Sequence, residues 1–306
     1  MRKFITFGKP CYDKNDIRLV TEILKSKWIG TGKKTLEFEN YFSKYKKIKY
    51  SLALNSCTAA LHLSLLTLNI KKGDEVITTP LTFCSTINSI LHVGAIPVLA
   101  DIDQNTLNID PKKILKKINK KTKAIIVVHF AGLSCDMNEI LKISKKYSIK
   151  VIEDCAHAIE TKYNNKQAGT LGDTGCFSFY STKNITTSEG GMLTTRNKKL
   201  ADRVKKLRLH GLSRDAWKRY SNIGKYKTYD IFEPGFKYNL TNMNAALGIN
   251  QLKKINIFWK KRKKIWDFYN SNLGDLPIKL PPKIPKGYKH AYHLYTIITV
   301  SYTHLT

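Results

Sequence analysis

Asp154 and Lys183 each follow a short apolar run, and their side chains are chemically complementary. The run that ends at Asp154 is rich in β-branched residues, and His157 comes shortly after it. A lysine amine can hold pyridoxal phosphate (PLP) as a Schiff base, and a carboxylate at a strand end can keep the pyridine nitrogen protonated. The pair therefore indicates PLP chemistry. The ordinary alternatives are a helix N-cap for Asp154 and a solvated surface lysine for Lys183.

Further positions could complete such a site. His157 could hydrogen-bond the phenolic oxygen of the ring, and Phe83 could stack on its face. Ser56, Cys57 and Thr58 open a predicted helix, where free backbone N–H groups can bind a phosphate. Each position also has an ordinary alternative: a half-buried histidine with satisfied hydrogen bonds, a core phenylalanine, or a simple helix cap. The chain has no GxxxxGK[ST] motif, so a P-loop nucleotidase is not supported.

The charge of the chain is extreme. Its 306 residues include 53 Lys and Arg against 23 Asp and Glu, a formal net charge of +30. Such a charge could indicate a nucleic-acid partner. However, the cations are nearly all lysines spread along the whole chain, whereas bidentate recognition of phosphate or guanine favours arginine. We therefore expect no nucleic-acid partner, although the charge could help to attract an anionic substrate.

The cysteines and the hydropathy pattern bear on the compartment. None of the six cysteines forms a CxxC pair or clusters with histidine at metal-ligand spacing, so we expect reduced thiols and no metal site. No apolar run approaches the length of a membrane span, and the N-terminus lacks the apolar core of a signal peptide. These features predict a cytoplasmic protein without a membrane partner.

Apolar runs alternate with helical patterns along much of the chain, which predicts an α/β fold with a mostly parallel sheet and helices on both faces. The expected strands are 75–79, 96–100, 124–128, 150–152, 176–179 and 191–195. The expected helices are 16–27, two that begin near 35 and 56, then 85–92, 111–118, 137–147, 199–210 and 241–272. Residues 212–238 are interpreted as a surface loop, 277–285 as an extended linker and 291–300 as a strand. We expect a large PLP-binding domain over residues 1–250, and a connecting helix with a small C-terminal domain over 251–306.

The order of these landmarks resembles the DegT/DnrJ/EryC1/StrS family of sugar aminotransferases, which are PLP enzymes of fold type I. The resemblance runs from about Ile5 to Tyr295. The matching segments are 26–32, 73–77, 153–158, 177–179, 183–184, 189–191, 210–212 and 235–241. It implies an aminotransferase of lipopolysaccharide or polysaccharide biosynthesis. Glutamate would give its amino group, leaving 2-oxoglutarate, to the C4 keto carbon of a nucleotide-sugar, as in UDP-4-amino-4-deoxy-L-arabinose synthesis.

The resemblance also implies a role for each residue. Lys183 matches the Schiff-base lysine, and Asp154 matches the carboxylate on the pyridine nitrogen. The other implied cofactor contacts are His157 at the ring oxygen, Phe83 at the ring face, Ser178 with the backbone of Cys57 and Thr58 at the phosphate, and Asn239. Asn239 matches the asparagine that reaches the phosphate of the neighbouring subunit, which implies a homodimer with shared active sites. Cys57 and Asn242 depart from the family's pattern, which has a small and an acidic residue there.

Two other functions on this scaffold remain as alternatives. A PLP-dependent sugar dehydratase usually has His where the Schiff-base lysine stands, and a non-catalytic relative would be expected to lose Lys183 or Asp154. Both residues are present, which favours the aminotransferase.

The end of the chain departs from the family's pattern. Only one strand is expected after Pro285, and a small domain needs several packed elements. Residues 301–306 look like a translated sequencing-adapter tail. We therefore expect a truncated small domain here, and a natural chain that continues with further strands and helices after Val300.

Overall fold

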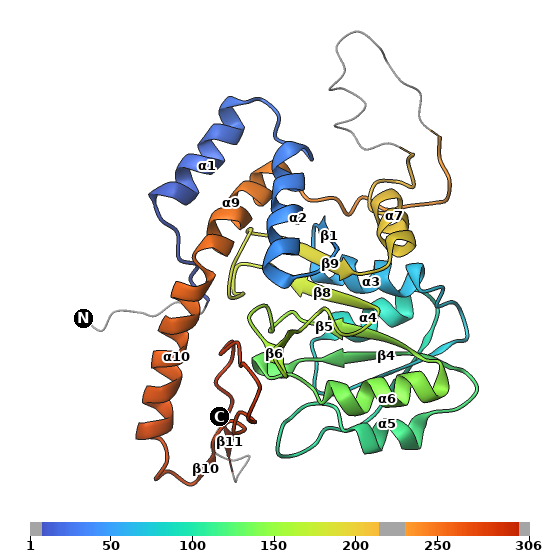
Figure 1. Cartoon of the computed structure of the whole chain (residues 1–306), viewed down its shortest axis with the longest axis vertical. Helices are drawn as coiled ribbons and strands as arrows, with labels where there is room; N and C mark the ends of the chain where they lie inside the picture. The colour runs from blue at the N-terminus through green and yellow to red at the C-terminus, as the bar shows by residue number, and fades with distance from the viewer. Residues whose placement is uncertain (1–7, 214–229, 300–306) are drawn as a thin grey trace.

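A computed structural model of the chain describes residues 8–213 and 230–299, and a seven-stranded sheet lies at its centre (Figure 1). The strand order is β1 (Tyr50–Leu54), β9 (Gly191–Thr195), β8 (Thr174–Ser178), β5 (Lys150–Asp154), β4 (Thr122–Val128), β2 (Glu75–Thr78) and β3 (Ile96–Leu99). The pairs from β8 to β3 are parallel, whereas β9 runs antiparallel to both β1 and β8. The predicted mostly parallel sheet is therefore confirmed.

Helices cover both faces of the sheet, because successive strand residues point to opposite sides. On one face, Ile126 and Ile152 pack in a core with α3 (Cys57–Thr67), α4 (Cys84–His92) and α7 (Lys198–Leu207). On the other face, Ile125 and Val151 pack in a core with α5 (Pro111–Lys117) and α6 (Met137–Tyr147), and Phe177 packs with α2 (Lys33–Lys46) and α9 (Asn242–Lys253). The helix α1 (Lys14–Lys25) lies against α9. None of the described helices is both long and apolar enough to cross a membrane.

The parallel arrangement determines where polar residues can meet. The strands β4, β5 and β8 end at Val128, Asp154 and Ser178, so these residues lie at one edge of the sheet. Carboxyl ends of parallel strands are a frequent place for ligand sites.

The long helix expected over 241–272 is wrong in one respect. It consists of α9, which ends at Lys253, and α10 (Ile255–Asn272), with Lys254 between them at φ −91° and ψ 0°. The ammonium group of Lys254 forms ion pairs with Asp13 and Asp16 at the start of α1. This anchor lies at the junction, and no local sequence pattern could have indicated it.

The strand expected over 291–300 is also mostly wrong. In the described part, only Ile298–Thr299 (β11) is a strand, and it pairs with β10 (Ile278–Lys279), which lies inside the expected linker. Tyr292 has φ 54°, which a strand does not allow. The segment instead lies beside α10 (Figure 1), and Ala291 and His293 donate backbone hydrogen bonds to the turn at Ala131 and Gly132.

Other differences are smaller. The short strand β1 was not expected, and several helix ends differ from the prediction by a few residues. Most of the predicted loop over 212–238, and the segment 301–306, lie outside the described residues.

Candidate active site

A cavity of about 390 Å³ lies at the carboxyl edge of β5 and β8. Its lining includes most of the residues predicted from the sequence: Cys57, Thr58, Phe83, Asp154, His157, Ser178 and Lys183. Glu189 and Gly190 of the matching segment 189–191 also line it, as do Ser85, Tyr180 and Thr182, which sequence reasoning did not single out. The fold thus brings together residues that are spread over more than a hundred positions of the chain.

Lys183 lies on the turn that follows β8, where its backbone N–H donates to the carbonyl of Tyr180 at 2.9 Å. Burial lowers the pKa of Lys183, and the nearby Cys57 and Asp154 oppose this effect only partly. Lys183 is therefore not an ordinary solvated lysine. A lowered pKa makes the neutral, nucleophilic amine more available.

Asp154 is buried at the end of β5. Its carboxylate accepts hydrogen bonds from the Thr86 hydroxyl at 2.9 Å and from the backbone N–H of Ala156 at 3.1 Å. Burial raises the pKa of Asp154, although these two hydrogen bonds and the charge of Lys183 counter the rise. The residues after Asp154 form a turn and not a helix, so the N-cap alternative is wrong. Thr86 carries no signal in the sequence that could have predicted its contact.

The N-terminus of α3 forms another wall of the cavity. Ser56 is its N-cap and accepts a hydrogen bond from the backbone N–H of Ala59 at 3.0 Å. The N–H groups of the first helical turn are directed outward from the helix end, which suits an anion. Gly191 of β9 allows the close approach, because a Cβ atom there would lie 2.3 Å from the Ser56 carbonyl. Ser178 lines the same cavity.

The two predicted ring contacts are also placed in the cavity. Phe83 is 74% exposed, so it is not a core phenylalanine. The Nδ1 atom of His157 is buried, and it has no hydrogen-bond partner among the described residues. Burial, with a smaller effect of Lys183, lowers the pKa of His157 to about 3, so its ring is neutral near pH 7.

Asn239 is the one predicted site residue that does not line the cavity. Its side-chain amide donates to the Thr31 hydroxyl at 2.6 Å. Its Oδ1 atom is buried without a hydrogen-bond partner among the described residues. A single chain therefore does not bring Asn239 to the site formed by its own Lys183.

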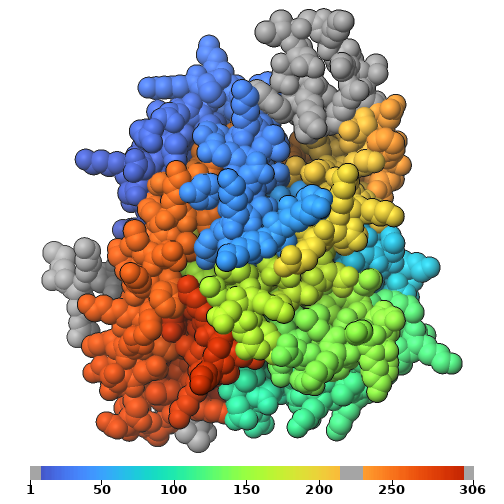
Figure 2. Space-filling view, in the orientation of Figure 1, coloured from blue at the N-terminus to red at the C-terminus, as the bar shows by residue number. Residues whose placement is uncertain are grey.

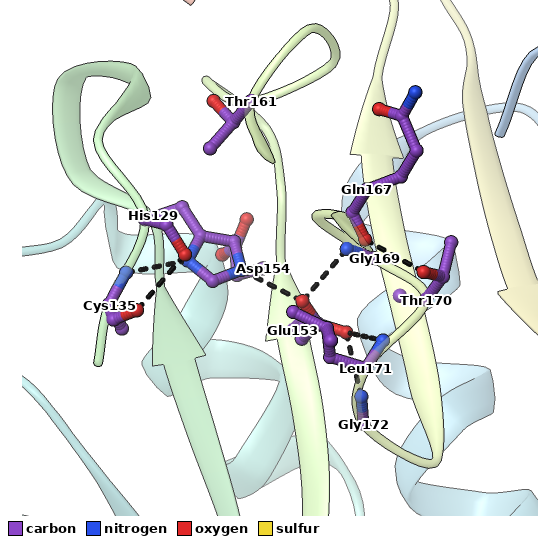
Figure 3. A network of polar contacts seen from close by, with 12 residues as sticks. His129, Cys135, Glu153, Asp154, Thr161, Gln167, Gly169, Thr170, Leu171 and Gly172 are labelled. Atoms are coloured by element: carbon purple, nitrogen blue, oxygen red, sulfur yellow. Dashed lines mark hydrogen bonds and ion pairs between the residues drawn. The ribbon is translucent and has the colours of Figure 1, made fainter. Parts of the chain in front are cut away.

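A buried network behind Asp154 was missed in the sequence (Figure 3). The Glu153 carboxylate accepts hydrogen bonds from the backbone N–H groups of Gly169, Leu171 and Gly172 at 2.7–2.8 Å, and it lies 3.0 Å from Nε2 of His129. The Nδ1 atom of His129 accepts from the backbone N–H of Cys135, so Nε2 carries the hydrogen. His129, Glu153 and Cys155 lie close enough for a metal site, but these hydrogen bonds already occupy the carboxylate. The network fixes β5 against the 169–172 loop.

Glu153→Gln is expected to lower the free energy of unfolding by about 3 kcal/mol, because buried donors lose a charged acceptor. Burial opposes ionisation, but the bonds from His129 and the backbone dominate and lower the pKa of Glu153. The stabilisation is therefore present above the unfolded-state pKa and lost as the pH falls through the folded-state value. The difference between wild type and variant should shrink in acid. Denaturant unfolding across pH measures it, with the exposed Glu139→Gln as control, which should change little. An equal effect of both variants would contradict the assignment.

The chemical groups that line the cavity suit PLP. It combines an amine, a buried carboxylate, a helix N-terminus, an exposed aromatic ring and a neutral imidazole, one nitrogen of which has no hydrogen-bond partner in the described part of the chain. These groups correspond to the aldehyde, ring nitrogen, phosphate, ring face and phenolic oxygen of that cofactor.

Comparisons with known proteins agree with this geometry. The profile of the DegT/DnrJ/EryC1/StrS aminotransferase family matches residues 10–304. The uncharacterized protein MJ1066 of Methanocaldococcus jannaschii is 53% identical, over 96% of this chain and 76% of the relative. The spore coat polysaccharide biosynthesis protein SpsC of Bacillus subtilis is 46% identical, over 96% of this chain and 75% of the relative.

Solved structures share the architecture of this chain. Spr1654 of Streptococcus pneumoniae, in its PMP form, superposes with a TM-score of 0.89 at 34% identity, over 95% of this chain and 78% of that one. It has also been solved in a PLP form. PseC of Helicobacter pylori, an aminotransferase of pseudoaminic acid biosynthesis, superposes with a TM-score of 0.88 at 33% identity, over 97% of this chain and 78% of that one. The chain therefore belongs to the DegT/DnrJ/EryC1/StrS aminotransferase family and is a PLP-dependent sugar aminotransferase of fold type I.

Proposed function

We propose that this protein transfers the amino group of glutamate to the C4 keto carbon of a nucleotide-linked sugar, as in the synthesis of UDP-4-amino-4-deoxy-L-arabinose. The observation that carries the proposal is the convergence of Lys183, Asp154 and the N-terminus of α3 on one cavity. The presence of Lys183 there favours transamination over sugar dehydration. The name of SpsC, a spore coat polysaccharide biosynthesis protein, supports a product destined for a polysaccharide. The location that we propose for this reaction is the cytoplasm.

In this proposal each side chain has a defined role. PLP, when bound, supplies an electron sink for the bonds at the substrate carbon. Lys183 would hold PLP covalently through Nζ, and its free amine would carry the proton at the α-carbon of glutamate. Asp154 keeps the ring nitrogen protonated, and its burial strengthens that electrostatic effect. The cofactor is oriented by His157 at its phenolic oxygen, Phe83 at its ring face, and Ser178 with the N–H groups of Cys57 and Thr58 at its phosphate.

Purified protein with PLP and glutamate is expected to aminate at least one member of a panel of 4-keto nucleotide-sugars. The panel should vary the nucleotide and the substituents at C2 and C6, and mass spectrometry with NMR would identify the aminated position. Formation of 2-oxoglutarate in equal amount is the internal control. Amination only at another carbon would contradict the C4 assignment.

We also propose a homodimer in which Asn239 serves the phosphate site of the partner subunit. The support is that Asn239 lies outside the cavity of its own chain, and that among the described residues its side-chain NH2 group donates only to the Thr31 hydroxyl, which leaves one N–H for a phosphate.

Mixing Lys183→Ala protein with Asn239→Ala protein should therefore restore activity. In a mixed dimer with Asn239 acting in trans, one of the two sites carries neither substitution. Verified subunit exchange is needed, and each variant mixed with itself serves as control. Exchange without recovered activity would argue that Asn239 does not act across the interface.

A further inference from the structure

We propose that His293 is a positioning residue of the active site: it holds the His157 ring and the turn that carries Lys183. His293 is not among the residues that line the cavity. Its ring centroid lies 4.4 Å from that of His157, with an angle of 32° between the planes. Its Nδ1 atom lies 2.7 Å from Oδ1 of Asn184, the neighbour of Lys183. This inference rests on the roles proposed above for Lys183 and His157.

The hydrogen bonds of Asn184 determine which atom of His293 carries the hydrogen. The side-chain nitrogen of Asn184 donates to the Glu160 carboxylate at 2.7 Å and to the backbone carbonyl of Ala291 at 3.2 Å. A carbonyl can only accept, so the amide oxygen of Asn184 must face His293. The Nδ1 atom of His293 is then the donor. The contact has a defined direction and a single tautomer.

The surroundings of His293 keep its ring uncharged. Burial lowers its pKa well below the ordinary value, and the nearby His157, Lys183, Arg262 and His290 lower it further. A neutral ring can rest against the neutral His157 without charge repulsion. The pair therefore keeps its geometry near neutral pH.

The segment that carries His293 is anchored on several sides. The backbone N–H of Ala291 donates to the carbonyl of Gly132 at 3.0 Å, and that of His293 donates to Ala131 at 3.2 Å. The indole N–H of Trp259 in α10 donates to the carbonyl of His290 at 2.7 Å. Figure 1 and Figure 2 show the segment, in red, next to α10, in orange. His293 is thus held in place by α10 and by the turn after β4. Through its contacts with His157 and Asn184, it can restrict the movement of these two residues at the cavity.

The His157 ring has little else to set its orientation. Its Nδ1 atom has no hydrogen-bond partner among the described residues. Among the described aromatic rings, Phe130 also contacts His157, edge-on and with 6.3 Å between the ring centroids. Loss of the His293 ring should therefore loosen His157, and loss of the bond to Asn184 should loosen the Lys183 turn. A displacement of about 1 Å at a reacting group can lower a rate on the order of 10²-fold.

The test compares PLP-loaded wild type with His293→Ala, His293→Phe, Asn184→Ala and the double variant His293→Ala/Asn184→Ala. Readouts are kcat, KM for glutamate, and the pH at which the visible absorbance of the bound cofactor changes, which reports the protonation of its linkage to lysine. Tyr295→Phe is the matched control. It removes one hydrogen bond of the same segment, from the Tyr295 hydroxyl to Asn270, on the exposed side.

His293→Ala is expected to lower kcat on the order of 10²-fold with little change in KM, and to shift the spectroscopic transition. His293→Phe keeps an aromatic ring against His157 and should recover part of kcat. Asn184→Ala should show the same shift of the spectroscopic transition. The loss of kcat in the double variant should be smaller than the product of the two single losses, because the two residues share one contact. Tyr295→Phe should behave like wild type.

Several results would overturn the inference. One is a kcat and a spectroscopic transition in His293→Ala that equal those of wild type. Another is a double variant whose loss of kcat equals the product of the two single losses. A third is a Tyr295→Phe variant that loses as much kcat as His293→Ala. If His293→Ala does not fold, His293→Phe and Asn184→Ala decide the question. Wild-type protein that fails to link PLP to Lys183 would overturn the proposed function and this inference together. If PLP is linked to Lys183 as expected but the His293 variants keep the kcat and the spectroscopic transition of wild type, only this inference is overturned.

Discussion

Replacing Lys183 with alanine is expected to abolish transamination, with a loss of roughly 10⁴-fold or more. The same Nζ atom would hold the cofactor and move the proton, so the variant loses both tasks at once. Wild-type protein should be yellow with PLP, and borohydride should attach the cofactor irreversibly to Lys183. Peptide mapping by mass spectrometry identifies the labelled lysine.

Lys46 provides a demanding comparison within the same molecule. It is fully buried, and burial lowers its pKa to about 8. Its ammonium group donates to the carbonyl of Ile159 at 3.0 Å, and it is not part of the cavity. A low pKa alone would therefore favour labelling of both lysines, whereas the geometry of the cavity favours Lys183 only. A label on Lys46, or on any other lysine, would contradict the assignment.

Replacing Asp154 with alanine is expected to leave the fold intact and to lower kcat on the order of 10²–10³-fold, as expected when one preorganised electrostatic group is removed. Without the carboxylate the ring nitrogen loses its proton, and the cofactor is a weaker electron sink. Burial raises the pKa of Asp154, so its charge is unfavourable in the protein without cofactor. Its removal also leaves the Thr86 hydroxyl and the Ala156 N–H without this acceptor, so the two effects oppose each other and the apo variant should unfold near the temperature of apo wild type.

Thr86→Val is the matched control for this experiment. It keeps the carboxylate and removes the 2.9 Å hydrogen bond to it, together with the 2.7 Å contact between the Thr86 and Thr82 hydroxyls, so the loss of kcat should be smaller than in Asp154→Ala. Steady-state kinetics and thermal unfolding of the apo and PLP-loaded forms measure both effects. Turnover of Asp154→Ala at the wild-type rate would show that the proposed role is wrong.

Much of the fold follows from local patterns. The apolar runs of β4, β5 and β8 and the periodicity of the helices are properties of neighbouring residues, so a single sequence shows them. The pairing of Asp154 with Lys183 could also be anticipated, because parallel strands place their carboxyl ends at one edge. The short strand β1 was missed, because five residues between two helices carry little periodic signal.

What the sequence by itself determined about this protein is therefore its family, its alternating α/β order and the chemical types in its site. Only the tertiary structure decided which residues support that site. Thr86 reaches Asp154 across 68 positions, Asn184 meets His293 across 109, and Lys254 meets Asp16 across 238. Such contacts depend on how whole elements pack, and no periodicity or spacing along the chain encodes them. The same cause explains the break between α9 and α10 and the irregular backbone around His293. At both places, groups from distant elements form hydrogen bonds with backbone or side chains that a continuous helix or strand would not make.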